Sequence, residues 1–325
     1  MKKILVTGAA GFVGRHLTQA LLEAGHTVYA VDGLVPLTGA MDPKKGWPFL
    51  APFDFSNFNF FHEDCRDWFL KNKADDFDYA YHAAALVGGR LMIENNPLAV
   101  AEDLAIDAAF WNWAKDVRPK KSICFSSSAA YPISLQRKND FVLLKETFIN
   151  FNENIGIPDM TYGWAKLTSE YLGRLAHDRY GLRTISFRPF SGYGEDQDDA
   201  YPFPSICKRV IANRGAKRIM VWGSGYQMRD FIHIDDCVEG ILSMVDKIDN
   251  GEAVNLSTGK FTSFREMASI ASRAVGFDPE VLGSTDLPEG VFARGGDIQK
   301  QSQLGFKAKV DISEGIERAV KFFTR

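Results

Sequence analysis

The chain lacks a large excess of charge of either sign. Its 325 residues include 38 lysines and arginines against 41 aspartates and glutamates, which gives a formal net charge of -3. Proteins that bind nucleic acids or anionic membrane surfaces usually carry clustered positive charge. The balance therefore argues against a nucleic-acid partner and against a membrane partner.

Long apolar runs are absent as well. No stretch reaches the roughly eighteen consecutive apolar residues that a membrane-spanning helix needs. The first residues, Met1-Lys-Lys-Ile-Leu-Val-Thr7, begin like a secretory signal, but the apolar part is short and runs directly into glycines that need a folded turn. We expect a cytoplasmic protein.

Cysteine is scarce and scattered. The chain has four cysteines with no Cys-x-x-Cys pair, and its six histidines show no spacing typical of metal ligands; the cysteines are Cys65, Cys124, Cys207 and Cys237. Cysteines so far apart are usually reduced and buried. The pattern predicts neither a disulfide framework nor a bound metal.

What the chain does have is a regular alternation of short apolar strands and helices. Apolar residues make up 46% of the sequence, which is ordinary for a globular protein. The expected strands are 3–7, 27–31, 58–62, 79–84, 122–125 and 183–187, and the expected helices are 12–24, 102–117 and 161–179. This order predicts an α/β fold of the Rossmann type, with a doubly wound parallel sheet.

The alternation loosens after Arg188-Pro189. Strand-like segments return at 219–222 and 253–256, and helical segments at 263–275 and 312–323. We therefore expect a smaller, discontinuous C-terminal lobe packed on the carboxyl edge of the sheet. The first domain would hold residues 1–188 with about 235–258, and the lobe would hold residues 189–234 with 259–325.

The connection 33–57 is long for a link between two strands, and it contains four prolines and a tryptophan. A connection of this length is either functional or folded against the surface. Both interpretations are open from the sequence.

A glycine-rich turn, Thr7-Gly-Ala-Ala-Gly-Phe-Val-Gly14, joins the first strand to the first helix. In this context Gly8 permits a tight turn, Gly11 lets a pyrophosphate approach the backbone, and Gly14 permits close helix packing. The free N–H groups of the helix terminus add a partial positive charge. The turn predicts a dinucleotide-binding site.

Asp32 ends the second strand at the distance expected for a residue that meets the cofactor ribose. Its carboxylate would accept hydrogen bonds from both ribose hydroxyls of NAD and would repel the 2′-phosphate of NADP. No lysine or arginine follows directly, so we expect NAD. Asp64, after the third strand, either binds the adenine amine or is an ordinary carboxylate at a strand end.

Tyr162 and Lys166 stand four residues apart in a helical segment. Positions i and i+4 share one face of a helix, so Lys166 can lie beneath Tyr162, and its positive charge favours the phenolate. Tyr162 is therefore a candidate acid/base for a hydroxyl that is being oxidised. The spacing alone is common, but together with the glycine turn it is informative.

These features together resemble the extended short-chain dehydrogenase/reductase family, in particular its nucleotide-sugar epimerases and dehydratases. The resemblance covers essentially the whole chain. It rests on Thr7–Gly14, Asp32, Asp64, His82-Ala-Ala-Ala85, Ser126-Ser-Ser128, Tyr162 with Lys166, Arg188-Pro-Phe190, Tyr193-Gly194, Gly223-Ser-Gly225, Arg229-Asp-Phe-Ile-His-Ile-Asp235 and Arg294-Gly-Gly-Asp297.

Within the family the chain is most similar to the GDP-mannose 3,5-epimerase branch. The shared segments are Gly88-Gly89, Val221-Trp-Gly-Ser-Gly225, Asp236-Cys-Val-Glu-Gly240 and Gly290-Val-Phe-Ala-Arg294. That branch has an acid/base cysteine where this chain has Ala129, and a loop lysine where it has the acidic run 195–199. Proton transfer at C3 and C5 is therefore not expected. The dehydratases place Asp-Glu after a catalytic threonine, where this chain reads Ser128-Ala129, so 4,6-dehydration is not expected either.

The resemblance implies that Ser127, Tyr162 and Lys166 are catalytic. Tyr162 would take the proton of the sugar C4 hydroxyl, Lys166 would hold the nicotinamide ribose, and Ser127 would hydrogen-bond the same oxygen, with Ser128 as the neighbouring candidate. The implied cofactor-binding residues are Gly8, Ala10, Gly11, Phe12, Val13, Asp32, Asp64, Cys65, Ala83, Ala84, Tyr162 and Lys166.

At the substrate end the resemblance implies that Arg229 and Arg294 hold the diphosphate of a nucleotide sugar, because guanidinium groups suit phosphate. Arg90 is unusual; it either reads a charged or bulky group of the sugar or faces solvent. The acidic run 195–199 is either a solvated loop or a contact to sugar hydroxyls. The implied substrate-binding residues are Gly88, Gly89, Ser128, Ser191, where the family usually has asparagine, Arg229, Arg294 and Asp297, which would take ribose hydroxyls.

The expected activity is 4-epimerisation of a GDP- or UDP-linked sugar through transient oxidation at C4, with GDP favoured through the branch likeness. The alternatives are a C4 dehydrogenase that releases a 4-keto product, a 3,5-epimerase-like or reductase activity, and a binding protein that has kept the fold but lost the chemistry. Apolar and aromatic residues on more than one face of helices 102–117 and 161–179 predict a homodimer.

Overall fold

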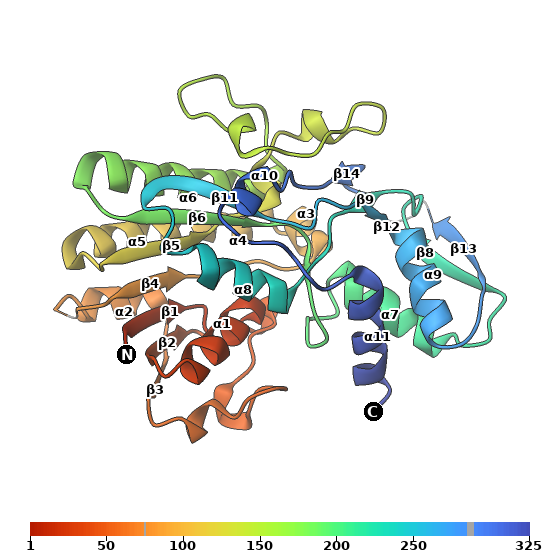
Figure 1. The fold of residues 1–325 in the computed structure, drawn as a ribbon, viewed down its shortest axis with the longest axis horizontal. Helices are drawn as coiled ribbons and strands as arrows, with labels where there is room; N and C mark the ends of the chain where they lie inside the picture. Colours follow the sequence, from red (N-terminus) through yellow and green to blue (C-terminus); the bar gives the residue numbers. More distant parts are fainter. Residues whose placement is uncertain (75, 285–288) are drawn as a thin grey trace.

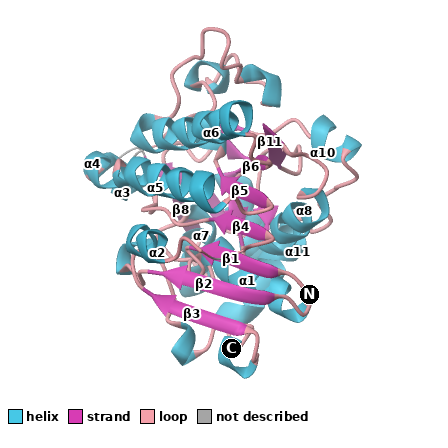
Figure 2. Cartoon of the chain, turned by 90° about the vertical axis from the view of Figure 1, so that its left-hand side faces the viewer, coloured by secondary structure: helices cyan, strands magenta, loops and turns pink. Residues whose placement is uncertain are grey.

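The computed structural model describes residues 1–74, 76–284 and 289–325, and its largest sheet has seven strands. All neighbouring strands of this sheet pair in parallel, in the order β11-β6-β5-β4-β1-β2-β3 (Figures 1 and 2). The order reverses at β1, so a crevice opens at the carboxyl ends of β1 and β4. The bounds are β1 Lys3–Thr7, β2 Thr27–Asp32, β3 Phe58–His62, β4 Tyr79–His82, β5 Lys121–Phe125, β6 Thr184–Pro189 and β11 Asn250–Leu256.

Helices cover both faces of the sheet, because successive side chains of a strand point to opposite sides. Ile4 and Val6 of β1 lie in one core with Leu17, while Leu5 lies in the other core with Phe110. Figure 2 shows the helices on either side of the sheet. The first core is covered by α1 (Phe12–Glu23) and α8 (Ile234–Met244), and the second by α2 (Cys65–Lys71), α5 (Glu102–Val117) and α6 (Met160–Tyr180).

A second group of elements lies beside the carboxyl ends of the strands (Figure 1). Its strands β8 and β13 pair in parallel, and its helices share a separate apolar core that includes Val210, Ile219, Met267 and Ile316. The elements are α7 (Pro202–Ala212), β8 (Arg218–Trp222), α9 (Phe264–Ala274), β13 (Glu280–Ser284) and α11 (Ile312–Phe323).

Two small sheets join the parts. One pairs β7 (Gly192–Tyr193) with β10 (Ile232–His233), and the other places β9 (Met228–Arg229) between β12 (Thr262–Ser263) and β14 (Ala293–Arg294). The remaining helices are α3 (Arg90–Asn95), α4 (Pro97–Val100) and α10 (Gln299–Gln303), with short 3-10 turns at Pro36–Thr38, Pro43–Lys45, Pro52–Asp54, Ser128–Ala130, Ile133–Gln136 and Glu146–Phe148.

The doubly wound α/β fold predicted from the sequence is confirmed, with differences in detail. The fourth strand ends at His82 and not at residue 84, because Ala83 and Ala84 leave the sheet and line a cavity. Helices α2, α7 and α8 were not predicted from the sequence. Pro202 and Pro204 stand in the first turn of α7, where a missing N–H costs nothing.

The long connection 33–57 both folds against the sheet and reaches the cavity. Trp47 is buried, packs edge-on against Phe58 and donates a hydrogen bond from Nε1 to the carbonyl oxygen of Met41 at 2.9 Å. Val35 and Gly39 line the cavity. The interpretation that the connection folds against the surface is therefore confirmed, and a functional role for Val35 and Gly39 stays a prediction.

The cysteines, the longest helices and the possible metal ligands can be compared with what the sequence predicted. Cys65, Cys124, Cys207 and Cys237 are free thiols and are buried. Across the described ranges, no helix is long and apolar enough to cross a membrane. Within those same ranges, no group of three or more His, Cys, Asp or Glu side chains has the arrangement of a metal site.

Candidate active site

A cavity of about 870 Å³ lies at the carboxyl ends of β1 and β4. Its wall includes the glycine turn after β1, Ser127, Tyr162, Arg229 of β9 and Arg294 of β14. This volume is near the upper end of the range for small-molecule sites. The cavity thus brings together residues that are far apart in the sequence, as the switch in strand order predicts.

The glycine turn leaves the backbone bare where the cavity meets α1. Gly8 has φ +67°, and a Cβ there would lie 2.6 Å from the backbone of Ala83 and Ala84. A Cβ on Gly14 would lie 1.9 Å from the carbonyl oxygen of Gly8. Only glycine fits these two positions, and the bare turn lets a phosphate reach the N–H groups that open α1.

Asp32 lies at the end of β2 and is oriented by backbone donors. Its Oδ2 accepts a hydrogen bond from the amide of Ala10 at 2.9 Å, and its Oδ1 accepts one from the amide of Leu34 at 2.7 Å. Burial raises the pKa of Asp32, and these amide bonds partly oppose the shift. Asp32 lines the cavity, whereas Ala10 lies behind it and holds the carboxylate in place.

Asp64 stabilises the start of α2. It caps α2 by accepting from the amide of Arg66 at 2.8 Å, and it pairs with the guanidinium of the same residue at 2.7 Å. The hydrogen bond from Arg66 is the main reason that the pKa of Asp64 is lowered. Asp64, Cys65 and Arg66 all line the cavity, and the adenine contact of Asp64 stays a prediction.

Ser127 and Tyr162 face the cavity from opposite elements. Ser127 follows β5 in extended backbone, and its Oγ accepts from the amide of Ala129 at 3.1 Å. Tyr162 lies in the first turn of α6, and Ser128 lines the same wall. The predicted hydroxyl-bearing side chains therefore line the same cavity.

Lys166 lies one turn after Tyr162, behind the wall of the cavity. Its Nζ is 5.7 Å from the centre of the Tyr162 ring and 3.6 Å from Oδ2 of Asp103. Burial alone would lower the pKa of Lys166, but Asp103 and Asp107 more than offset it, and the pKa is raised. Asp103 and Asp107 were not singled out in the sequence, although two carboxylates four residues apart in an apolar helix were the available signal.

Arg229 and Arg294 stand opposite each other because β9 and β14 pair in register. Arg229 donates only to backbone carbonyl oxygens in the described part of the chain, those of Met228 at 2.8 Å and Val291 at 2.9 Å. Burial, followed by the nearby charge of Arg294, lowers the pKa of Arg229 to about 9. A half-buried guanidinium with no carboxylate partner in the described residues suits an anionic ligand.

Asp159, just before α6, links two further guanidinium groups. Its carboxylate accepts from Arg294 at 2.7 Å and from Arg90 at 3.1 Å, and Arg90 also donates to Glu94 at 2.6 Å. Arg90 lines the cavity. Of the two alternatives for Arg90, the structure supports the one in which it faces the site.

The remaining predicted substrate residues divide into two groups. Gly88, Gly89 and Ser191 line the cavity, and a Cβ on Gly89 would lie 2.2 Å from the carbonyl oxygen of Ala200. Asp297 does not line the cavity; its side chain accepts from the amide of Gln299 at 2.9 Å, near the start of α10. Its contact with a ribose stays a prediction.

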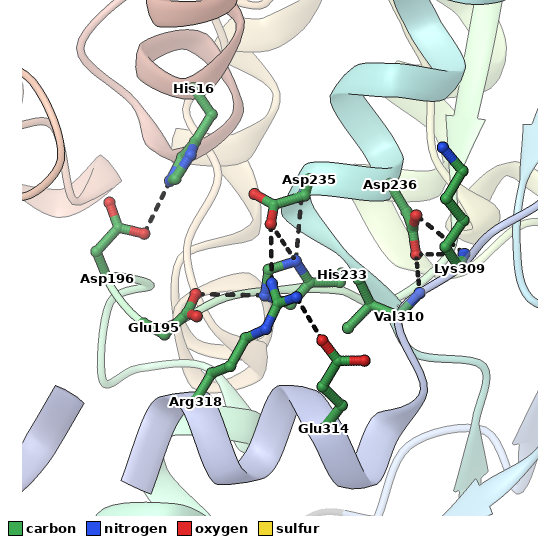
Figure 3. Close-up of polar contacts among 10 residues, drawn as sticks. All are labelled: His16, Glu195, Asp196, His233, Asp235, Asp236, Lys309, Val310, Glu314 and Arg318. Carbon is green, nitrogen blue, oxygen red and sulfur yellow. Dashed lines mark hydrogen bonds and ion pairs between the residues drawn. The ribbon is translucent and has the colours of Figure 1, made fainter. Parts of the chain in front are cut away.

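The acidic run 195–199 is anchored at its beginning (Figure 3). Asp196 is buried and pairs with Arg15 of α1 at 2.7 Å and with His16 at 2.9 Å, and Glu195 lies 3.3 Å from His233. The interpretation of a solvated loop is therefore wrong for Glu195 and Asp196. Farther along, Gln197 to Tyr201 line the cavity, so this segment closes one side of the site.

The described residues fit the cofactor predicted for them. The bare glycine turn is shaped for a pyrophosphate, and Asp32 presents a carboxylate at the place of a ribose. Tyr162 would face the nicotinamide end, with the ammonium group of Lys166 behind it.

Comparison with known proteins agrees with this geometry. The sequence profile of the NAD dependent epimerase/dehydratase family matches residues 4–257. A putative UDP-glucose 4-epimerase of Methanocaldococcus jannaschii is 28% identical over 98% of this chain and 97% of its own length. GDP-mannose 3,5-epimerase of Arabidopsis thaliana is 27% identical over 97% of this chain and 80% of its own length.

Solved structures give the same result. A tyrosine-to-phenylalanine variant of UDP-glucuronic acid 4-epimerase from Bacillus cereus, in complex with a fluorinated UDP-glucuronic acid and NAD, superposes with a TM-score of 0.84, at 26% identity and 99% coverage of both chains. UDP-glucose 4-epimerase of Thermotoga maritima, in complex with UDP-glucose, gives 0.81, at 25% identity, covering 99% of this chain and 98% of that chain.

The fold, the cavity and these comparisons lead to one assignment. The residues matched by the family profile include the glycine turn, Ser127, Tyr162 and Lys166. The protein is an enzyme with NAD as its cofactor, of the nucleotide-sugar epimerase type. The chain belongs to the NAD dependent epimerase/dehydratase family.

Proposed function

We propose that the protein is a 4-epimerase of a nucleotide-linked sugar that acts through transient oxidation at C4. The observation that carries the proposal is that one cavity holds three kinds of group. They are a bare glycine turn, the hydroxyl groups of Ser127 and Tyr162, and Arg229, which has no carboxylate partner among the described residues. Such a site suits a dinucleotide cofactor, a sugar hydroxyl and a diphosphate.

In the proposed reaction Tyr162 acts as the base. Its phenolate oxygen takes the proton of the C4 hydroxyl, while Ser127 donates a hydrogen bond to the same oxygen. Lys166 keeps a positive charge beneath the phenol ring. When bound, NAD would accept the hydride from C4 and return it to the opposite face of the C4 ketone. Tyr162 would give the proton back to the C4 oxygen, so that the net reaction would be 4-epimerisation.

The cofactor and the nucleotide sugar would be bound by different parts of the chain. We propose that residues 1–188 with about 235–258 bind the cofactor, and that residues 189–234 with 259–325 hold the nucleotide sugar. Arg229 and Arg294 would bind the diphosphate, because paired guanidinium groups provide several parallel N–H donors. The register of β9 with β14 supports this role.

The chemistry at C4 is favoured over proton transfer at C3 and C5. Ala129 is 3% exposed and lines the cavity at the position where the 3,5-epimerase branch has its acid/base cysteine. A methyl group there can neither take nor give a proton. Among the described lining residues, Tyr162 is the side chain best placed for acid/base work at one carbon.

The nucleotide is proposed to be GDP or UDP. The likeness to the 3,5-epimerase branch, which includes a relative named for GDP-mannose, favours GDP. The solved relatives that hold UDP-glucuronic acid and UDP-glucose favour UDP. A panel that contains both series separates these alternatives.

The direct test is turnover. The NAD-loaded enzyme is mixed with GDP- and UDP-linked sugars, absorbance is followed at 340 nm, and the products are identified by NMR. A new C4 epimer without a lasting NADH signal is the expected result. Stable NADH together with a 4-keto product would identify a dehydrogenase and would reject the proposal.

The first prediction concerns Tyr162. Tyr162→Phe removes the only atom that can accept the C4 proton from this side chain, and we expect turnover to fall at least about 100-fold. NAD binding, measured by fluorescence titration, should stay within about threefold. Tyr171→Phe is the matched control, because Tyr171 lies on the same helix and is 44% exposed. Equal activity of Tyr162→Phe and the control would contradict the assignment.

A homodimer and a cytoplasmic location also remain proposals. Large apolar side chains are exposed on the outer side of α4, α5 and α6, namely Leu98, Leu104, Trp164 and Tyr171. A second copy of this chain would cover them in a four-helix arrangement.

A further inference from the structure

A buried polar cluster lies behind Lys166, on the side away from the cavity. It consists of Asp103 and Asp107 of α5, His82 at the end of β4 and Thr7 at the end of β1, and each of the four is at most 3% exposed. Polar groups at this depth are costly unless they are paired. The reaction proposed above uses none of the four.

Asp103 joins two parts of the site. Its Oδ1 accepts a hydrogen bond from the amide of Leu86 at 2.5 Å, and Leu86 belongs to the segment that lines the cavity next to Gly88. Its Oδ2 has no hydrogen-bond partner in the described residues, is closed to solvent, and lies 3.6 Å from Nζ of Lys166. This atom is therefore aimed at the lysine and at no other described group.

Asp107 is engaged from the other side. Its Oδ1 lies 3.2 Å from Nε2 of His82, whose Nδ1 shares a hydrogen bond of 2.7 Å with Oγ1 of Thr7. The His82 ring stacks on Phe110 with centroids 4.2 Å apart, which fixes its orientation. Burial lowers the pKa of His82, so the imidazole is held neutral. The positive charge that faces the two carboxylates is then that of Lys166.

We propose that Asp103 is a positioning residue for the reaction proposed above: it keeps Lys166 protonated and at a fixed depth beneath Tyr162, and it ties the lysine to the cavity wall at Leu86. This inference rests on the proposed function, since Lys166 matters only if Tyr162 is the base. A buried lysine without a counter-charge readily loses its proton. Asp103 would prevent that loss.

The charged groups around the pair define the effect of removing Asp103. Lys166 faces Asp103, Asp107, Tyr162 and Cys124, and Tyr162 also faces Arg294 and Tyr201. In Asp103→Asn the amide oxygen can still accept from Leu86, but the charge is lost. Lys166 then loses its proton at lower pH, and the phenolate of Tyr162 loses the charge that favours it.

The test measures tyrosinate directly and needs no substrate. Absorbance at 295 nm is followed against pH for the NAD-bound enzyme, and the same titration of Tyr162→Phe is subtracted to isolate Tyr162. In Asp103→Asn, again with its own Tyr162→Phe partner, we expect the Tyr162 transition to move up by about one pH unit or more. An unchanged or lowered transition would overturn the proposal.

Activity gives an independent readout. In Asp103→Asn we expect kcat at neutral pH to fall at least tenfold and to recover as pH rises, with KM for the sugar changed less than threefold. Asp116→Asn is the control, because Asp116 lies on the same helix but its side chain is 54% exposed. This variant should leave both pH profiles unchanged. A uniform loss of kcat at all pH values would mean a structural role only and would reject the proposal.

A second variant covers the possibility that Asp103→Asn does not fold. Asp107→Asn keeps the contact of Asp103 with Leu86 and should move the Tyr162 transition in the same direction by a smaller amount. If neither folded variant moves it, the proposal is wrong. If the wild type turns over no nucleotide sugar yet the transition moves as expected, the proposed function fails and the role of Asp103 stands.

Discussion

At the scale of single residues, the three arginines of the site differ in whether a carboxylate pairs with them. Arg90 and Arg294 share Asp159, while Arg229 has only backbone carbonyl oxygens among the described residues. The sequence identified all three arginines but not Asp159, because an aspartate before a helix is usually a cap. Here the Asp159 side chain turns to the guanidinium groups, which no local pattern reveals.

The unpartnered arginine leads to a prediction about binding and stability together. Arg229→Met removes donors to the diphosphate, and we expect kcat/KM to fall about 10- to 100-fold, corresponding to about 1.5–3 kcal/mol. The substitution also removes a half-buried charge without a carboxylate partner, so the free energy of unfolding without ligand should stay equal or rise by about 1 kcal/mol.

Steady-state kinetics and urea unfolding measure the two effects. Arg218→Met is the matched control, since the Arg218 side chain is exposed at the start of β8 and pairs with Glu280. A large loss of stability in Arg229→Met, with kcat/KM unaffected, would show that Arg229 is structural.

At the scale of elements, charged pairs join α1 to the segment before α7, and α8 to α11. Figure 3 shows His16 with Asp196, and His233 between Glu195 and Asp235, with Arg318 of α11 next to Asp235. The sequence pattern predicted α1 and α11 as helices but not α8. It did not predict their ion pairs, because these partners come from segments whose separation along the chain carries no periodic signal.

His233 gives this junction a dependence on pH. Burial alone would lower the pKa of His233, but Asp235 and Glu195 outweigh it and raise the pKa to about 9. The stabilisation is therefore fully present below the unfolded value of 6.5 and is lost as pH rises through about 9. We expect the free energy of unfolding to fall by about 1–3 kcal/mol between these values.

Urea unfolding at a series of pH values measures this slope. In His233→Gln the slope between pH 6.5 and 9 should be smaller than in the wild type. Parallel curves for the two proteins would show that His233 does not carry the dependence.

At the scale of the whole molecule, the doubly wound parallel sheet and the glycine turn followed from the sequence, but the order of the strands did not. The turn between Gly8 and Gly14 could be predicted from the sequence because only glycine fits there: Cβ atoms at both positions would collide with the backbone. The substrate end was less accessible to prediction. Asp297 was expected in the cavity and lies outside its lining, because its side chain caps the chain near α10.

The outer face of α5 and α6 leads to a prediction about assembly. Leu104, Trp164 and Tyr171 are 39%, 49% and 44% exposed, so a dimer would remove a sizeable apolar area from water. We expect a dimer by size-exclusion chromatography with light scattering, and a monomer for Trp164→Glu. Tyr226→Glu, on a different face and 56% exposed, should stay dimeric. A monomeric wild type would contradict the proposal.

The position of β11 sets the order in which the molecule can be completed during synthesis. β6 is buried at five of its six positions, yet its outer neighbour β11 comes only after residues 190–249 have been made. Until then β6 is an unpaired edge strand, and such edges pair readily with other chains. During synthesis the glycine turn is therefore made early, whereas the strand that covers β6 is made late. A chain that stops before residue 250 leaves the edge of β6 unpaired and is expected to aggregate rather than to fold as a smaller enzyme.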